Sequence, residues 1–348
     1  MSTQKSLLLL EENGSFAVRD TEIPKPGPGE LLIENHATAL NPVDWKIQAY
    51  WFFFIQSYPA VIGTDGAGIV KELGEGVTGF AVGDKVLYQG YFSNREATFQ
   101  QYSINPAEIT AKIPKNITVD QAATIPLVLA TAVLGLYGSK ASGSARGDGA
   151  GLTPPWEEGG RGKYAGQPIL VIGGSSAVGQ QVLQLARLSG FSPIITTASK
   201  HNDALVKSLG ATHVIDRTTP LLQGLQSITS IPIKIVYDAI SEAETQNTAY
   251  DALASGGKLI LVLASEIDET KLTSDKQLAN VYGTVHYMDQ RTLGVSLYKN
   301  LSRLLETGDI KPNNVEVLPN GLAGIPDGLE KLKAGKVSAA KLVAHPQE

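Results

Sequence analysis

The sequence predicts an α/β protein made of a mostly β domain followed by a domain with a doubly wound parallel sheet. Three observations support this prediction. The chain has 348 residues, more than one ordinary domain needs. Its first part contains short alternating apolar runs broken by Gly and Pro. From Pro168 onward, strand-like runs alternate with helical periodicity, which is typical of strand–helix–strand units. We expect domains at 1–128 and 129–288, and a segment at 289–348 that returns to the first domain.

The first domain is predicted from strand-length apolar runs at 7–10, 31–33, 67–70 and 85–88, separated by Gly/Pro-rich turns at 24–29 and 73–77. The run at 7–10 is too short for a signal-peptide core or a membrane span, and Glu11 follows it at once. We therefore interpret it as the first strand and expect a cytosolic protein.

Two segments connect the domains. Residues 122–132 are small or apolar around Pro126, which predicts helical segments on either side of the proline. Residues 138–163 are rich in Gly, Ser and Pro and lack an apolar period. This composition predicts an exposed, mobile loop.

The second domain is predicted from the alternation of its elements. We expect strands at 169–172, 194–197, 213–215, 233–237 and 258–262, and helices at 178–188 and 203–209. The C-terminal segment adds a helix at 293–306, a strand at 315–318, a helix at 329–333 and a final run at 340–343. Repeated strand–helix–strand units imply a parallel sheet with helices on its faces.

Composition excludes several classes of function. The net charge is −5, from 29 Lys and Arg against 34 Asp and Glu, so neither nucleic acid nor an anionic membrane is expected as a partner. The chain has no cysteine, which excludes disulfides, thiolate nucleophiles, Fe–S clusters and cysteine-based zinc sites. No two of its five histidines are four residues apart and none lies in an HExxH-type motif, so we expect no metal site. A His/carboxylate site assembled from distant residues is the alternative.

The strongest local motif is a glycine-rich turn between a predicted strand and a predicted helix. Gly174, Ser176 and Gly179 occupy the three positions of G-x-G-x-x-G, with Ser175, Ala177 and Val178 between them. The glycines permit a tight turn and close helix packing, and the helix N-terminus offers N–H groups to a pyrophosphate. A turn without a ligand is the alternative interpretation.

The end of the second strand indicates the type of dinucleotide. NAD sites carry an acid there for the ribose 2′-hydroxyl. This chain has Ser199, Lys200 and Asn202 before its first acid, Asp203. Because Ser199 and Lys200 can donate to a 2′-phosphate, we expect NADPH. A solvated loop lysine is the alternative.

Four further motifs follow one another in the first domain: PGPGELLI at 26–33, LNPVDWK at 40–46, IGTDGAGIV at 62–70 and VGDKV at 82–86. With these motifs the whole chain resembles the medium-chain dehydrogenase/reductase superfamily, and most of all its zinc-free quinone oxidoreductases and the fungal enoyl reductases that act in trans with polyketide synthases. The resemblance implies a GroES-like domain and a Rossmann domain. Residues 138–163 are longer than the matching segment of typical quinone reductases.

The resemblance also bears on zinc. Zinc-dependent members carry Cys where Asp44 stands, and His-Glu where Thr64 and Asp65 stand. Without such a Lewis acid a simple carbonyl is poorly activated. This favours a substrate whose double bond is conjugated with an oxygen.

The resemblance implies candidate site residues. Asn41, Lys46 and Tyr50 are the catalytic candidates, with a turn cap, a surface lysine and aromatic packing as their respective alternatives. Around the nicotinamide it implies Thr131, Ile240, Leu263, Tyr282 and Thr284, with an ordinary helical threonine as the alternative for Thr131. The aromatic run at 50–54 is a candidate lining for an apolar substrate pocket, or a buried or dimer contact.

We therefore expect a zinc-independent, NADPH-dependent reductase that adds hydride to an enone, an enoyl ester or a quinone. The expected partners are a small apolar conjugated substrate and a synthase acting in trans. A carbonyl or quinone reductase in detoxification and a non-catalytic NADPH-binding protein are the alternatives. The sequence leaves monomer and homodimer open.

Overall fold

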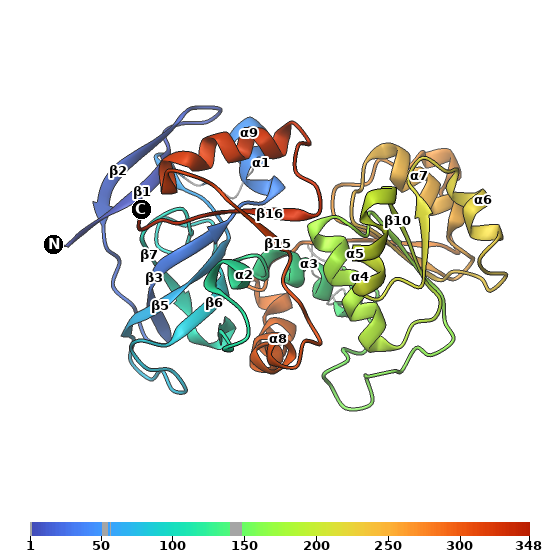
Figure 1. The fold of residues 1–348 in the computed structure, drawn as a ribbon, viewed down its shortest axis with the longest axis horizontal. Helices are drawn as coiled ribbons and strands as arrows, with labels where there is room; N and C mark the ends of the chain where they lie inside the picture. Colours follow the sequence, from blue (N-terminus) through green and yellow to red (C-terminus); the bar gives the residue numbers. More distant parts are fainter. Residues whose placement is uncertain (1, 51–54, 56, 140–147) are drawn as a thin grey trace. The chain divides into compact units, whose positions relative to one another are not determined.

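The computed structural model describes residues 2–50, 55, 57–139 and 148–348 (Figure 1). It divides into two compact units. The first comprises Met1–Leu127, Gly294–Gly308 and Pro312–Glu348, and the second comprises Val128–Leu293 and Asp309–Lys311. The chain therefore enters the first unit at its start and again near its C-terminal end.

Two sheets form the frame of the first unit. The smaller sheet has the antiparallel order β2 (Phe16–Glu22), β1 (Thr3–Leu9), β4 (Ala60–Val61). The larger sheet has the order β15 (Asn314–Val317), β16 (Ala340–Ala344), β3 (Glu30–Ala39), β5 (Asp65–Leu73), β6 (Lys85–Gln89), β8 (Thr110–Lys112), and β7 (Tyr102–Pro106) also pairs with β3. Through the pairing of β16 with β3, the C-terminal segment becomes part of this sheet.

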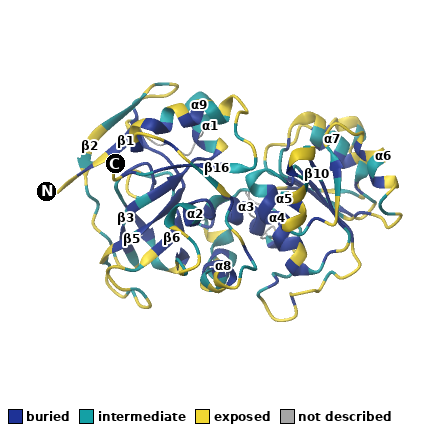
Figure 2. Ribbon diagram, viewed as in Figure 1, coloured by how far each residue is buried: buried dark blue, intermediate teal, exposed yellow. Residues whose placement is uncertain are grey.

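The sheets of the first unit enclose an apolar core, drawn in dark blue in Figure 2. Leu9, Ile62 and Phe99 belong to one cluster in this core and are fully buried. Leu342, on β16, completes that cluster from the far end of the chain. Each such side chain contributes roughly 1.5–3 kcal/mol when it leaves water. Core packing therefore holds the returning strand in place.

Helices cover the first unit and lead out of it. α1 (Pro42–Tyr50) packs on α9 (Ile325–Lys333), and α2 (Val119–Ala123) packs on the larger sheet. α3 (Pro126–Tyr137) begins in the first unit and continues in the second, as α8 (Met288–Glu306) does in the reverse direction. Short 3-10 turns lie at Ala107–Ile109 and Gly321–Gly324.

One stretch among the described residues, Val119–Tyr137, is long and apolar enough to cross a membrane by length and composition. It consists of α2 and α3, and 72% of it is buried inside the fold. Core helices of globular proteins show this same combination of length, apolar composition and burial. The stretch is therefore interpreted as core.

The second unit contains a six-stranded parallel sheet, which confirms the predicted α/β fold. Its order is β11 (His213–Asp216), β10 (Ile194–Ala198), β9 (Ile169–Ile172), β12 (Ile235–Asp238), β13 (Lys258–Leu261), β14 (Gln277–Asn280). Its helices include α4 (Ala177–Ser189), α5 (Asp203–Ser208), α6 (Leu221–Gln226) and α7 (Ala243–Ala252), with 3-10 turns at Lys200–Asn202 and Glu269–Lys271. The edge strand β14 was not predicted, because only Ala279 of its four residues is buried.

The described part of the 138–163 segment makes backbone and ring contacts with α3. The Ala150 N–H donates to the Gly135 carbonyl at 2.7 Å, and the Leu152 N–H donates to the Leu136 carbonyl at 3.0 Å. The Trp156 ring lies edge-on to Tyr137, with 5.5 Å between ring centroids. Residues 148–163 form the irregular, largely exposed loop that the composition predicted, and these contacts attach its first part to α3.

The C-terminal residues are held by a histidine between two carboxylates. The two ring nitrogens of His345 lie 2.9 Å from Glu348 Oε1 and 3.0 Å from Asp120 Oδ1. Partial burial lowers the pKa of His345, but the hydrogen bonds and charges of Glu348 and Asp120 outweigh it and leave the pKa above its ordinary value. Asp120 belongs to α2, so the contact ties the chain end to that helix.

This arrangement makes the stability of the fold depend on pH. The raised pKa means that the stabilisation by His345 is complete below the pKa of an unfolded histidine, about 6.5, and is lost as the pH rises through the folded value. H345Q should therefore lower Tm by roughly 1–3 °C at pH 5.5 and by less at pH 8.5, since solvent screens this half-exposed pair. Thermal melts at both pH values measure this, with H213Q as the control. An equal loss at both values contradicts it.

Candidate functional site

The second unit carries a glycine-rich turn between β9 and α4. Gly173 adopts the left-handed region with φ of 74°. The Ser176 side chain caps α4 by accepting the Gly179 N–H at 3.0 Å. The hydroxyl hydrogen of Ser176 remains to be donated to a ligand. The predicted residues Ser175, Ala177 and Val178 complete the turn and are half-buried.

The glycines of this turn are required by close backbone packing. A Cβ on Gly174 would lie 2.1 Å from Thr196 Oγ1, and a Cβ on Gly179 would lie 2.2 Å from the Gly173 oxygen. The turn then opens onto the N-terminus of a 13-residue helix, whose positive dipole end attracts anions. This arrangement fits the pyrophosphate of a dinucleotide.

The end of β10 has the predicted residues in a short turn. Ser199 is half-buried and accepts the Asn202 N–H at 2.8 Å through its carbonyl, while Lys200 is exposed. The Asn202 side chain is buried inside this turn. Asp203 forms an ion pair with Lys207 at 2.8 Å on its own helix. The first acid after β10 is thus already paired with a lysine.

The end of the neighbouring strand β11 adds two residues that the sequence analysis missed. The Arg217 N–H donates to the Ala198 carbonyl at 3.1 Å, which places Arg217 beside the end of β10. Asp216 accepts the Thr218 hydroxyl at 2.6 Å and the Thr218 N–H at 2.9 Å. These bonds, with one from the Lys200 N–H, hold the pKa of Asp216 below its usual value. The adjacency of parallel strand ends could have predicted Arg217 as a neighbour of Lys200.

Of the residues predicted to lie near the nicotinamide, Thr131, Tyr282 and Thr284 are neighbours in the second unit. A Cβ on Gly283 would lie 2.2 Å from Thr131 Oγ1, so the backbone at 282–284 packs directly on α3. The Tyr237 hydroxyl donates to the Thr131 carbonyl at 2.9 Å. The Thr284 N–H donates to the Tyr282 carbonyl at 2.8 Å, and the Tyr282 and Tyr287 rings lie 5.0 Å apart.

Two more predicted residues lie at the carboxyl edge of the same sheet. The Ile240 N–H donates to Asp238 Oδ1 at 3.0 Å, and the Ile240 side chain lies 2.5 Å from where a Gly173 Cβ would stand. Ile240 therefore packs against the glycine-rich turn. Leu263 follows β13 and is 38% exposed, which leaves its side chain open to a ligand.

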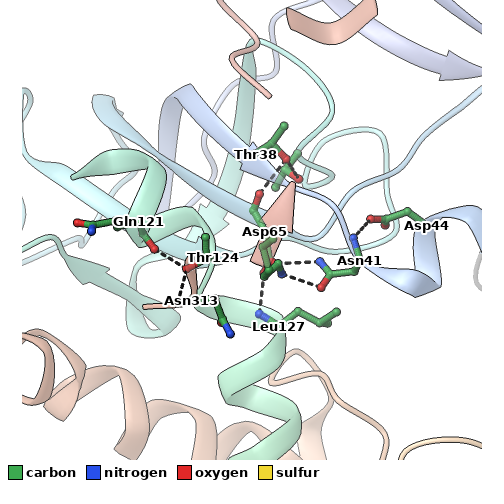
Figure 3. Close-up of polar contacts among 10 residues, drawn as sticks. Thr38, Asn41, Asp44, Asp65, Gln121, Thr124, Leu127 and Asn313 are labelled. Atoms are coloured by element: carbon green, nitrogen blue, oxygen red, sulfur yellow. Dashed lines mark hydrogen bonds and ion pairs between the residues drawn. The ribbon is translucent and has the colours of Figure 1, made fainter. Parts of the chain in front are cut away.

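The first unit contains a buried polar cluster centred on Asp65 (Figure 3). The Asp65 carboxylate accepts the Asn41 Nδ2–H at 2.8 Å, the Leu127 N–H at 2.6 Å and the Lys341 ammonium. The Lys341 ammonium also donates to Asn41 Oδ1 at 2.8 Å. The side chains of Asp65 and Lys341 are 0% and 2% exposed, so this ion pair is shielded from water. The sequence analysis did not identify Lys341.

Asp44 extends this cluster. Its Oδ2 accepts the Asn41 N–H at 2.7 Å, and its Oδ1 has no hydrogen-bond partner among the described residues. Burial raises the pKa of Asp44 to about 8; the charge of Asp65 adds to the rise, and the Asn41 N–H and Lys341 oppose it. Burial therefore favours the neutral carboxylic acid form of Asp44 at pH 7.

Lys46 and Tyr50 lie on α1, outside the cluster. The Lys46 ammonium lies 5.6 Å from the centroid of the Trp45 ring, a cation–π contact. Tyr50 is 66% exposed and packs edge-on against Trp45 at 5.9 Å. The remainder of the aromatic run, 51–54, lies outside the described residues.

The donors of this cluster do not fit a zinc ion. Asp65 is already paired with the Lys341 ammonium, and Asp44 Oδ2 accepts the Asn41 N–H. Zinc sites use deprotonated ligands, usually four, drawn from Cys, His and carboxylates. Within residues 2–50, 55, 57–139 and 148–348, no group of three or more His, Cys, Asp or Glu side chains could hold a metal ion.

The raised pKa of Asp44 predicts a stability change with pH. Between about pH 4 and pH 8 the folded chain keeps a proton on Asp44 that the unfolded chain releases, so stability falls as the pH rises. D44N has no titrating carboxyl group at this position, so its stability lacks this dependence on pH. Its Tm relative to wild type should therefore rise by roughly 5 °C or more from pH 5 to pH 8, measured by thermal melts. D20N, at an exposed carboxylate, is the matched control. A difference that stays constant across this range contradicts a neutral Asp44.

Comparisons with known proteins agree with this description. Residues 27–115 match the alcohol dehydrogenase GroES-like domain, and residues 177–300 match the zinc-binding dehydrogenase domain. A trans-enoyl reductase of a Penicillium species is 31% identical, covering 98% of each chain. A zinc-type alcohol dehydrogenase-like protein of Schizosaccharomyces pombe is 32% identical over 97% of this chain and 99% of its own length.

Solved structures share the fold over the full length. An alcohol dehydrogenase superfamily protein from Novosphingobium aromaticivorans superposes with a TM-score of 0.80 at 25% identity, covering 98% of this chain and 99% of its own. The two matched domains and the full-length relatives describe the same two-unit chain. It is thus a member of the medium-chain dehydrogenase/reductase superfamily, an oxidoreductase with a GroES-like domain and a Rossmann domain.

Proposed function

We propose that the protein is a zinc-independent reductase that transfers hydride from NADPH to a C=C bond conjugated with a carbonyl, as in an enone or an enoyl ester. The observation that carries this proposal is the cluster of Asp44, Asp65 and Lys341, in which a buried ammonium, and no metal ligand set, faces the carboxylate. Without a metal to stabilise the negative charge that hydride transfer creates, a substrate that delocalises this charge is favoured. A C=C bond conjugated with a carbonyl does so, because the charge moves to the carbonyl oxygen. Relatives named trans-enoyl reductases support the enoyl assignment.

The second unit supplies the residues that would hold the cofactor. The turn at Gly174–Gly179 would receive the pyrophosphate, and Lys200, Ser199 and Arg217 would surround a 2′-phosphate. Thr131 and the backbone at 282–284 would support the nicotinamide. When bound, NADPH supplies a hydride, and the protein's own task is to orient the substrate and stabilise charge.

The first unit supplies the groups for the substrate. Hydride addition to the β-carbon moves the electron pair of the C=C bond to the carbonyl oxygen, and a proton then joins the α-carbon. Asn41 is the proposed donor to that oxygen, and Lys46 and the exposed Tyr50 are the proposed proton sources. A synthase that presents its acyl chain in trans is the proposed partner.

The side chains of Lys200 and Arg217 should determine whether the protein prefers NADPH or NADH. K200A and R217A should each weaken NADPH binding about tenfold to a hundredfold, the range expected for one lost charge-assisted hydrogen bond, and leave NADH binding unchanged. Fluorescence titration of both cofactors measures this. K207A, whose ammonium pairs with Asp203, is the control and should have no effect. Tighter binding of NADH than of NADPH by the wild type would refute the 2′-phosphate site.

The reaction itself is tested with a substrate panel. The wild type should oxidise NADPH with enones and enoyl thioesters faster than with simple aldehydes or quinones, and N41A should lower kcat/KM about a hundredfold. N116A, which removes a hydrogen bond to the Leu305 carbonyl in the same unit, controls for general loss of fold. A preference for quinones or aldehydes favours the detoxifying reductase. NADPH binding without turnover of any compound favours the non-catalytic protein.

A further inference from the structure

Lys341 has more partners than an ion pair requires. It lies on β16 with its side chain 2% exposed, and its ammonium contacts both Asp65 and Asn41 Oδ1. A buried ammonium costs several kcal/mol unless it is paired and hydrogen-bonded. The hydrogen bond to Asn41 therefore offsets part of the free energy of burying the ammonium. It also connects the positive charge of Lys341 to an amide at the proposed site.

The Asn41 amide is fixed in one orientation by this network. Its Oδ1 accepts from Lys341, and one Nδ2 hydrogen goes to Asp65. The flipped amide would place its NH2 group against the ammonium and its oxygen against the carboxylate, so the network excludes it. The second Nδ2 hydrogen has no acceptor in the part of the chain that the structure describes. It is the donor left for a ligand.

We propose that Lys341 is a positioning residue that transmits positive charge through the Asn41 amide to the carbonyl oxygen of the substrate. The inference rests on the proposed function, since it assumes that Asn41 contacts that oxygen. An ammonium that donates to the amide oxygen polarises the amide and makes its N–H a stronger donor. Asn41 is only 1% exposed, so an oxygen that reaches it enters a nearly dry environment, where such interactions are strong.

The charge balance of the cluster supports this role. Asp65 carries a negative charge, which is offset by Lys341, by the Asn41 amide and by the Leu127 N–H at the N-terminus of α3. Burial of Asp44 disfavours a second negative charge beside Asp65, and raises the pKa of Asp44 to about 8. Lys341 thus keeps the cluster from being negative, and a negative cluster would repel the enolate that hydride addition creates.

The test separates the charge of Lys341 from its shape. In D65N/K341Q both charges are removed together, while amide groups can keep the hydrogen bonds to Asn41. K341R keeps the charge. The probe is 4-(dimethylamino)cinnamaldehyde bound with NADP⁺, because this push–pull aldehyde absorbs at longer wavelength when its oxygen is polarised and the oxidised cofactor cannot reduce it.

We expect a red shift of the probe in the wild type and in K341R, and a shift reduced by at least about half in D65N/K341Q, as the lost polarisation requires. The kcat for an enone should fall about tenfold to a hundredfold in the double variant, with NADPH binding unchanged. A purely structural role would alter Tm and leave the probe shift intact.

Two outcomes overturn the inference: a full shift in D65N/K341Q, or a bound probe without any shift in the wild type. If D65N/K341Q does not fold, K341R decides, since loss of the shift in a folded K341R also overturns it. A wild type that shifts the probe but reduces no conjugated substrate refutes the proposed reaction and leaves the role of Lys341 standing.

Discussion

The ion pair between Lys341 and Asp65 is the contact on which the arrangement of the first unit's polar site depends. It joins β16, β5, the start of α1 through Asn41 and the start of α3 through Leu127. A buried pair of this kind adds little net stability, but removing one partner costs about 3–5 kcal/mol, because the other charge is left unpaired in an apolar environment. The pair therefore restrains geometry more than it stabilises the fold.

The same contact shows why the sequence predicts the glycine-rich turn of the second unit better than the polar cluster of the first. The glycine-rich turn is local: Gly174 and Gly179 are five residues apart, and their spacing predicts a backbone conformation. Lys341 and Asp65 are separated by 276 positions, and no spacing rule connects them. Arg217 is an intermediate case. The sequence analysis did not name it, but its position beside the end of β10 could be predicted once β10 and β11 are known to be adjacent parallel strands.

In the segment at 148–163, close backbone packing accompanies the loop that composition predicted. A Cβ on Gly149 would lie 2.2 Å from the Leu134 oxygen, and a Cβ on Gly160 would lie 1.9 Å from the Pro154 oxygen. These glycines therefore permit close backbone approach. The edge strand β14 was missed because it is only partly buried. It therefore lacks the continuous apolar run that predicted the central strands.

The glycine-rich turn of the second unit and the polar cluster of the first unit also differ in the kind of chemistry that they suit. A phosphate is bound by backbone N–H groups at a helix N-terminus, so the requirement on sequence is for small residues at fixed spacing. The proposed enolate would need oriented donors in a dry environment, and the candidate donor Asn41 is held by side chains from separate segments, Asp65 and Lys341. Because each of these side chains is held by the other two, the cluster constrains them jointly, and a change at one position alters the electrostatics of all three.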